Sequence, residues 1–392
     1  MAKLKTALIA SAISATVLIS LFLAIETLPA EKQTSEPPFF VGVEIGWLAN
    51  VDQSKAIIDK VKDYTNLIII ASPSITAQES TLNETCDYAY NAGMYLMVYF
   101  SMQIFPDNYT LTNTTQMSIS TLRPFMWEMG AKQKYGERFL GVYFNDEPGG
   151  QVLDSNSTQN LNPNYSEIAR IFIQNNTDKM NIYAYLRDRG LGAPIFTSDY
   201  GLYWYDYESG FDVVLAQLGW NNSRLVQVAL TRGAAAVHNK NWGVMVTWTY
   251  TETPYLESGS ALYEDLVLAF DSGAKYMAVY DSSAKYQNTT LTEDHFNALK
   301  NFWNYTQENP NKHGNLKADT ALILPKDYGF GFRSTIDSVW GIKPDENTQK
   351  MYTDVQKLLN NYGSTLDIVY NEPIYIDKIA KDYNELITWT NP

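Results

Sequence analysis

Short runs of apolar residues, rich in β-branched and aromatic side chains, recur along the chain from Phe39 onward. Each run is nearly continuous in hydrophobicity, which is typical of parallel strands that are buried on both faces. The runs predict eight strands, at Phe39–Ile45, Asn66–Ala71, Met94–Phe100, Phe139–Phe144, Ala193–Thr197, Asp212–Leu218, Gly243–Tyr250 and Lys275–Tyr280.

Longer stretches with apolar residues three and four positions apart lie between these runs, and that spacing predicts amphipathic helices. Gly93, Gly190 and Gly273 come just after three of them, where a left-handed residue commonly ends a helix. Between the fifth and sixth strands the pattern predicts only an aromatic loop, Asp199–Glu208. The predicted helices are Gln53–Tyr64, Leu82–Ala92, Ser118–Tyr135, Tyr165–Asp188, Ser223–Asn239, Ser260–Ser272 and Thr292–Tyr305.

Eight strands that alternate with helices over residues 39–310 are the pattern of an α/β chain closed into a (β/α)8, or TIM, barrel. A doubly wound open sheet is the alternative, but it normally has fewer strands, and the sequence has no glycine-rich dinucleotide loop after the first one. Residues 311–392 predict a small α/β accessory module, with strands at 320–325, 366–370 and 385–390 and a helix at 346–362.

The N-terminus carries an uncharged run, Thr6–Ile25, between Lys5 and Glu26. Its length lies between the apolar core of a secretory signal and a membrane span, so residues 1–30 are a signal peptide or, as we favour, an uncleaved anchor helix. A buried soluble helix is the remaining alternative. A signal peptide and an anchor helix both predict export. Residues 31–38 would then be a linker, and the chain after it would lie outside the cell, either secreted or anchored at the cell surface. Asn-x-Ser/Thr sequons agree with export, at Asn83, Asn108, Asn113, Asn156, Asn164, Asn175, Asn221, Asn288 and Asn304.

The net charge of -14 argues against nucleic acid and anionic membrane surfaces as partners, because both repel an acidic protein. Membrane contact is therefore expected only through the N-terminal segment. Cys86 is the only cysteine, and His238, His295 and His313 are scattered without metal-ligand spacing. We expect no disulfide, metal or cofactor, and the sequence carries no signal for an oligomeric state.

Acidic and aromatic residues gather at the carboxyl ends of the predicted strands, where barrel enzymes carry their functional side chains. Carbohydrate chemistry uses this combination, because glycosidic cleavage needs two carboxyl groups and aromatic rings stack on sugar faces. We therefore expect a carbohydrate substrate or ligand. The candidates for binding it are Glu44, Trp47, Asn145, Asp199, Trp204, Gln217, Trp220, Trp248, Tyr250 and Asp281, beside the carboxylates Asp146, Glu147 and Glu252.

The barrel resembles the superfamily of retaining (β/α)8 glycoside hydrolases, whose acid/base Glu lies between an Asn and a Pro after strand four and whose nucleophile Glu ends strand seven. Here strand four ends in Asn145-Asp146-Glu147-Pro148 and strand seven in Thr251-Glu252. The resemblance covers residues 39–310. It implies that Glu147 is the acid/base and Glu252 the nucleophile.

Asp146 departs from that pattern because it separates the Asn from the Glu. An adjacent Asp-Glu pair is similar instead to the hexosaminidase-type families, in which the substrate's acetamido group is the nucleophile, the Asp orients it and the Glu is the acid. In that case Glu252 would only bind substrate. Successive strand residues face opposite sides, so Asn145 and Glu147 could share a face.

A non-catalytic alternative fits the same features, namely a glycan-binding or structural surface protein on a degenerate barrel. An Asp-Glu-Pro after a strand can simply cap the next helix. Glu44, within a strand, needs a partner if it is buried, either in the site or through Arg123 or Lys275. Carboxyl groups about 5 Å apart would favour retention and about 6.5–9.5 Å inversion.

Overall fold

The computed structural model describes residues 37–47, 49–100, 119–155, 163–282 and 289–390. The predicted anchor or signal helix at residues 1–30 lies outside these ranges, as does most of the predicted linker. Within the described ranges no helix has both the length and the apolar character needed to cross a bilayer.

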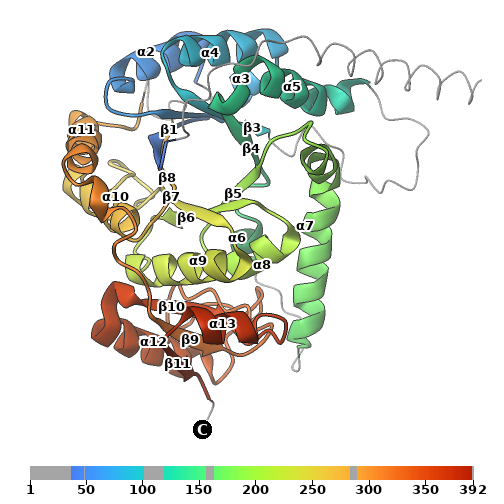
Figure 1. Cartoon of the computed structure of the whole chain (residues 1–392), viewed down its shortest axis with the longest axis vertical. Helices are drawn as coiled ribbons and strands as arrows, with labels where there is room; N and C mark the ends of the chain where they lie inside the picture. The colour runs from blue at the N-terminus through green and yellow to red at the C-terminus, as the bar shows by residue number, and fades with distance from the viewer. Residues whose placement is uncertain (1–36, 48, 101–118, 156–162, 283–288, 391–392) are drawn as a thin grey trace, which may run out of the picture. The chain divides into compact units, whose positions relative to one another are not determined.

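Eight parallel strands close into a barrel in the order of the sequence, which confirms the predicted (β/α)8 fold (Figure 1). The closing pair is β1 with β8, and the register places Glu44 beside Ile69 on one side and Tyr280 on the other. The strands are β1 Phe40–Gly46, β2 Leu67–Ile70, β3 Tyr95–Phe100, β4 Phe139–Phe144, β5 Ile195–Asp199, β6 Val213–Leu218, β7 Asn241–Val246 and β8 Tyr276–Ser282.

Helices surround the strands (Figure 1). The seven predicted helices are present with bounds within three residues of those expected, whereas the short helices α3 (Pro73–Thr76) and α6 (Pro148–Leu153) are not predicted by the apolar spacing. Within the aromatic segment predicted as a loop, residues 203–209 form a short helix, because its tyrosines and tryptophan are buried against neighbouring elements rather than exposed. The helices of the barrel are α2 Val51–Val61, α3 Pro73–Thr76, α4 Glu79–Asn91, α5 Ile119–Tyr135, α6 Pro148–Leu153, α7 Tyr165–Asp188, α8 Tyr203–Ser209, α9 Arg224–His238, α10 Gly259–Asp271 and α11 Glu293–Glu308.

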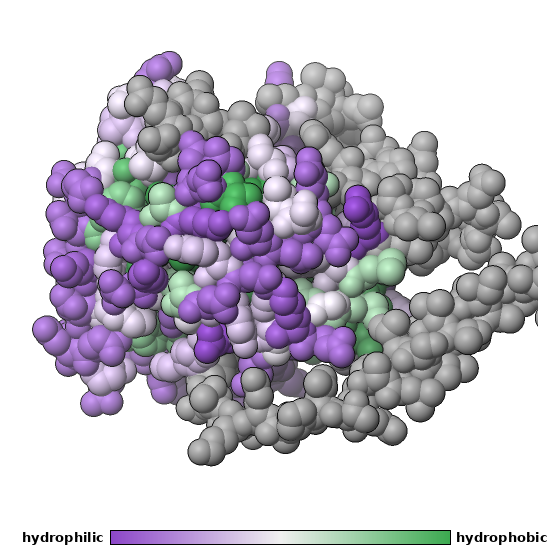
Figure 2. All heavy atoms as spheres, turned by 90° about the horizontal axis from the view of Figure 1, so that it is seen from above, coloured by the Kyte–Doolittle hydropathy of each residue, from purple (hydrophilic) through white to green (hydrophobic). Residues whose placement is uncertain are grey.

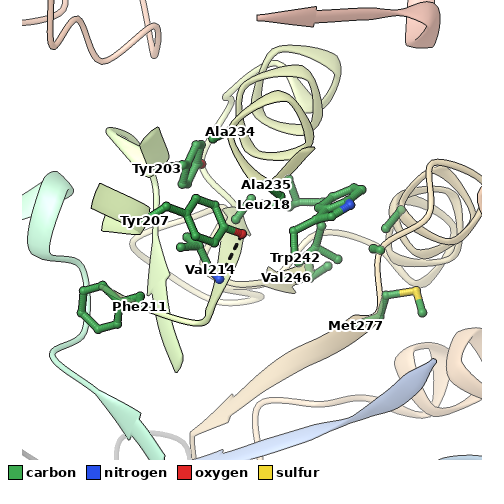
Figure 3. Packing of buried hydrophobic residues seen from close by; sticks show 14 of the residues in the cluster. Tyr203, Tyr207, Phe211, Val214, Leu218, Ala234, Ala235, Trp242, Val246 and Met277 are labelled. Carbon is green, nitrogen blue, oxygen red and sulfur yellow. Dashed lines mark hydrogen bonds between the residues drawn. The ribbon is translucent and has the colours of Figure 1, made fainter. Parts of the chain in front are cut away.

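Two apolar layers hold the barrel together, one inside the strands and one between strands and helices. Inside, Phe40 stacks on Tyr276 with ring centroids 5.2 Å apart, and Phe196 meets Tyr276 edge-on at 5.0 Å. Outside, α8 and α9 cover β6 and β7 with buried aromatic and alanine side chains (Figure 3). There the hydroxyl of Tyr207 accepts a hydrogen bond from the Val214 amide at 3.3 Å.

The C-terminal part forms a second parallel sheet in the order β10-β9-β11, with β9 Thr320–Leu324, β10 Leu366–Tyr370 and β11 Glu385–Thr388. Helices α12 Thr348–Tyr362 and α13 Ile376–Asp382 accompany it. The sheet lies against α9 (Figure 1). Arg232 of α9 forms a buried ion pair with Asp367 of β10 at 2.8 Å. Beside it a Cβ on Gly233 would lie 2.6 Å from the Ile368 carbonyl oxygen, so only glycine allows this close packing.

The described atoms of the face above α2 and α4 are mostly hydrophilic (Figure 2). Some predicted glycosylation sequons do not lie in exposed loops. Asn83 is inside α4, where its side chain accepts a hydrogen bond from Trp127 Nε1 at 2.8 Å, and the hydroxyl residue of its sequon, Thr85, is fully buried. Asn304 is inside α11 with Thr306 buried. The sequons at Asn108, Asn113, Asn156 and Asn288 are outside the described residues.

Candidate active site

Glu44 is the carboxylate of the barrel interior. Phe40 packs inside the strands, and because side chains alternate along a strand, Glu44 four residues later also points inward. Its side chain is buried, and Oε2 has no hydrogen-bond partner among the described residues. Burial raises its pKa well above the usual value, and the charges of Asp146 and Glu147 raise it further. The charged groups that act on it are therefore carboxylates, and not the Arg123 or Lys275 that the sequence offered as partners.

Asp146 and Glu147 follow β4 on a tightly turned backbone. Glu147, like Asn145, has a left-handed conformation, with φ of 56° and 54°, which is rare for residues other than glycine. The Glu147 amide donates to the Ser198 carbonyl at 2.8 Å, fixing the turn against β5. The Tyr143 hydroxyl, inside the barrel, donates to Asp146. The turn thus holds two adjacent carboxyl groups, both half-buried, at the carboxyl end of the strands.

The electrostatics of this pair suit proton transfer. Burial is the main cause that raises the pKa of each carboxyl group, and the Glu147 charge raises that of Asp146 further. A hydrogen bond from the Gln217 side chain, at the end of β6, acts in the opposite direction on Glu147. A raised pKa favours the protonated form of a carboxyl group, and that form can donate its proton to a leaving group.

Glu147 opens into a pocket of about 430 Å³, and that size is within the range of small-ligand sites. The walls come from the loops after β4, β5 and β6 and, unexpectedly, from the C-terminal module. The lining residues are Glu147, Asp154, Tyr200, Trp220, Asn222, Arg333, Ser334 and Asp337. The last three are not among the residues predicted from the sequence, because no motif marks the segment that carries them.

Asn145 and Asp199, both predicted to bind substrate, face structural partners instead. The Asn145 amide donates to Asn176 of α7 at 2.7 Å, so this side chain points into the helix layer and does not share a face with Glu147. Asp199 is fully buried and accepts hydrogen bonds from the backbone amides of Gly149 and Gly150. It holds the first turn of α6, and thereby the backbone that follows Glu147.

Asp281 and Trp204 are also placed away from the pocket. Asp281 accepts hydrogen bonds from the Thr290 amide at 2.8 Å and the Thr289 hydroxyl at 2.9 Å, and so holds the loop after β8. Trp204 is 2% exposed and packs edge-on against His238 of α9. His238 thus lies in aromatic packing, where it also contacts Tyr375. Cys86 is buried in the core.

The loop after β7 differs from the predicted strand end. The strand ends at Val246, and the chain then turns back, with the Tyr255 amide donating to the Glu252 carbonyl at 2.9 Å. Glu252 is exposed in this turn and is not among the residues lining the pocket. Met245 faces the barrel interior, and because side chains alternate along a strand, position 247 is expected to face inward as well. The residue at position 247 is a threonine rather than a carboxylate.

Three predicted aromatic residues are exposed around the strand ends: Trp47 after β1 at 60%, Trp220 after β6 at 44% and Tyr250 after β7 at 48%. Trp248 packs against Tyr280 at 5.9 Å between ring centroids. Exposed aromatic rings of this size are the surfaces on which sugars stack, and only Trp220 of the three lines the pocket. No group of three or more His, Cys, Asp or Glu side chains suited to a metal ion occurs in the described part of the chain.

No protein-family model matches the sequence, and no curated protein matches it significantly. Solved structures do match its fold. A GH5_18 protein from Streptomyces cattleya in complex with Manb1-4GlcNAc has a TM-score of 0.52 at 12% identity, over 89% of this chain and 98% of that one. The GH5_18 protein from Bifidobacterium longum with the same ligand has a TM-score of 0.51 at 12% identity, over 89% and 96% of the two chains.

A fucosidase structure is similar to the same degree. The alpha-L-fucosidase isoenzyme 2 from Paenibacillus thiaminolyticus has a TM-score of 0.51 at 11% identity, over 85% of this chain and 58% of that one. At such identities the likeness concerns the fold. The chain has the (β/α)8 fold of these glycoside hydrolases.

Proposed function

We propose that this chain is a glycoside hydrolase in which Glu147 is the general acid and Asp146 the second functional carboxylate. The observation that carries the proposal is that Glu147 lines a pocket at the carboxyl ends of the strands while the neighbouring carboxyl group of Asp146 interacts with it electrostatically. Burial raises the pKa of Glu147, which favours its protonated form, and a hydrogen bond from the Gln217 side chain orients the group. Barrel enzymes carry their chemistry at this end.

In the proposed reaction the Glu147 carboxyl group gives its proton to the glycosidic oxygen as the bond from the anomeric carbon to that oxygen breaks. Positive charge develops on the sugar ring, and the Asp146–Glu147 pair, which has given up the transferred proton, carries the compensating negative charge. Tyr143 donates a hydrogen bond to Asp146 and fixes its orientation. Water completes the hydrolysis, and Glu147 recovers its proton from that water molecule.

The identity of the nucleophile distinguishes two versions of this reaction. Attack by Glu252 would require the exposed turn after β7 to bring that side chain into the pocket. Attack by an acetamido group of the substrate requires only the Asp146–Glu147 pair. The second version is favoured, because the residue directly after β7 is Thr247 rather than a carboxylate and Glu252 does not line the pocket. Sugars with an N-acetyl group are then the expected substrates, and Manb1-4GlcNAc, the ligand in the GH5_18 structures, is a suitable first probe.

Chromogenic glycosides with and without an N-acetyl group test the assignment. Glu147→Gln should lower kcat by about 10²–10⁴-fold, the usual contribution of a general acid. Glu79→Gln, at an exposed glutamate in α4, is the matched control and should be silent. Glu252→Gln should retain activity if the substrate supplies the nucleophile. Turnover that survives Glu147→Gln would refute the acid assignment, and binding without turnover in the wild type would favour a glycan-binding protein.

We also propose that the chain is exported, with its barrel outside the cell. The support is the lysine-flanked uncharged run Thr6–Ile25 at the N-terminus. Export is tested by fractionating cells that express the full chain and by treating intact cells with protease. A full-length product that is protected in the cytoplasm would refute it.

A further inference from the structure

The wall of the pocket that comes from the C-terminal module suggests a role for that module. We propose that Arg333 is a substrate-positioning residue whose guanidinium binds hydroxyl or carbonyl oxygens of a sugar unit held beside Glu147, and that this subsite accepts neutral rather than anionic sugars. The proposal rests on the proposed function, since it concerns the same pocket.

The module reaches the pocket through the segment 326–345, which packs on α6 directly after Glu147. Ser338 Oγ donates to the Leu153 carbonyl at 2.6 Å, and a Cβ on Gly331 would lie 2.9 Å from a Leu153 methyl carbon. At the end of α6, Arg333 Nη1 binds Asp154 at 2.7 Å. Residues about 180 positions apart in the sequence are thus joined at one rim of the pocket.

The guanidinium of Arg333 is held in one orientation. Its Nε and Nη2 donate to the two carboxylate oxygens of Asp337 at 2.9 and 2.7 Å, which is the bidentate geometry that fixes arginine most firmly. It also lies over the ring of Tyr200, at 5.2 Å from the centroid, and the Tyr200 hydroxyl donates to Asp154 at 2.6 Å. Such a side chain is pre-organised and loses little freedom when a ligand binds.

The remaining donors of Arg333 are what a ligand would use. A guanidinium has five N–H groups, and the structure assigns three of them, one each on Nε, Nη1 and Nη2. Among the described residues, the second N–H on each terminal nitrogen has no acceptor, and the side chain is 18% exposed where it lines the pocket. Paired donors in a pocket that Trp220 also lines match the hydroxyl groups and apolar face of a pyranose ring.

The charge balance of the pocket decides which sugars fit. Asp154 and Asp337 both bind Arg333, so two carboxylates surround one guanidinium, and Glu147 adds a third acidic group. Asn222 and Ser334, the other polar lining residues, are neutral. A uronate, sulfate or phosphate group would meet net negative charge here and would be repelled, whereas hydroxyl and N-acetyl groups find both donors and acceptors.

The test compares Arg333→Lys and Arg333→Ala with Arg170→Lys, a surface arginine that also binds a carboxylate bidentately. Full-length variants are assayed on the best chromogenic glycoside from the screen and titrated with Manb1-4GlcNAc by calorimetry. Thermal unfolding identifies any variant that fails to fold. Arg333→Lys keeps the positive charge but removes the planar pair of N–H donors, so KM and Kd should rise by about 10–100-fold with a smaller change in kcat. Arg170→Lys should have the same KM, Kd and kcat as wild type.

The outcomes separate this proposal from the one on which it rests. Unchanged KM and Kd in folded Arg333→Lys, with activity lost in Glu147→Gln, would overturn the subsite alone. Activity that survives Glu147→Gln would overturn the proposed function whatever Arg333 does. Preference for a uronate- or sulfate-bearing glycoside over its neutral counterpart would overturn the charge argument.

Discussion

Two buried carboxyl groups lie behind the pocket. From them we predict how the stability of the folded chain changes with pH, independently of the substrate. Asp199 accepts backbone hydrogen bonds from the start of α6, and Asp206 of α8 lies beside it. Asp206 is fully buried, and neither of its oxygens has a geometrically defined hydrogen bond among the described residues. Burial, and then the charge of Asp199, raises its pKa well above the usual 3.8. The folded pair therefore retains a proton that the unfolded chain releases.

The sign follows from proton linkage. A group whose pKa rises on folding holds more protons in the folded state, so stability is greatest below the unfolded pKa and falls as pH rises. Each retained proton lowers the free energy of unfolding by about 1.4 kcal/mol per pH unit. One proton retained from about pH 4 to pH 7 corresponds to roughly 4 kcal/mol. Burial also raises the pKa of Asp199, to about 7, so the pair retains at least one proton over this window.

Asp206→Asn replaces the neutral carboxyl group with a neutral amide of the same shape, which can donate to Asp199. The variant should therefore lose this part of the pH dependence and should be more stable than wild type at pH 7, by at most about 4 kcal/mol. Urea unfolding followed by tryptophan fluorescence at several pH values measures the difference, with the exposed Asp63→Asn as control. Parallel pH profiles for wild type and Asp206→Asn would refute the reasoning.

Three further changes test other parts of the structure. Arg232→Ala should destabilise the chain by about 3–5 kcal/mol in urea unfolding, because it leaves Asp367 buried without its cation; a loss below about 1 kcal/mol would contradict the importance of that pair. Gly150→Ala should reduce activity, and it should lower the stability measured by thermal unfolding by about 1–3 kcal/mol, because the added Cβ would lie 2.2 Å from Tyr200 Cζ. Wild-type kinetics in this variant would show that the residues around the pocket move to accommodate the methyl group. Trp220→Ala should weaken binding of Manb1-4GlcNAc about tenfold in calorimetry without a change in Tm, because the ring is 44% exposed; unaltered affinity would exclude stacking there.

The barrel could be predicted from the sequence because strand hydrophobicity and helix periodicity agree along the whole of its length. The helix α7, for example, has the predicted bounds Tyr165–Asp188. The sequence did not predict α8. Its seven residues are rich in Tyr and Trp and nearly all buried by the surrounding helices and sheet, so they do not alternate between a polar and an apolar face as an amphipathic helix does. Strand β7 was predicted too long because its apolar composition continues into the turn at residues 247–250.

Strand ends in the sequence pointed to Glu147, on the turn after β4, and to Gln217, near the end of β6, and the fold brings these two side chains into contact, while their roles stay predictions. Alternation placed Asn145 on the wrong side, because left-handed residues after β4 break the strand period. Arg333 could not be found, because only tertiary packing connects segment 326–345 with α6. Glu252 remains a prediction whose role the kinetic test above decides.

The contact between segment 326–345 and α6 also couples sugar binding to the docking of the C-terminal module, two properties that are usually measured separately. If a sugar bridges Glu147 and Arg333, its binding energy stabilises the docked position of the C-terminal module, and by reciprocity a firmly docked module raises sugar affinity. Local opening of the module would remove one wall of the pocket while the barrel stays folded. Hydrogen exchange of the β10 amides, which are remote from the pocket, would then report how fully the pocket is occupied.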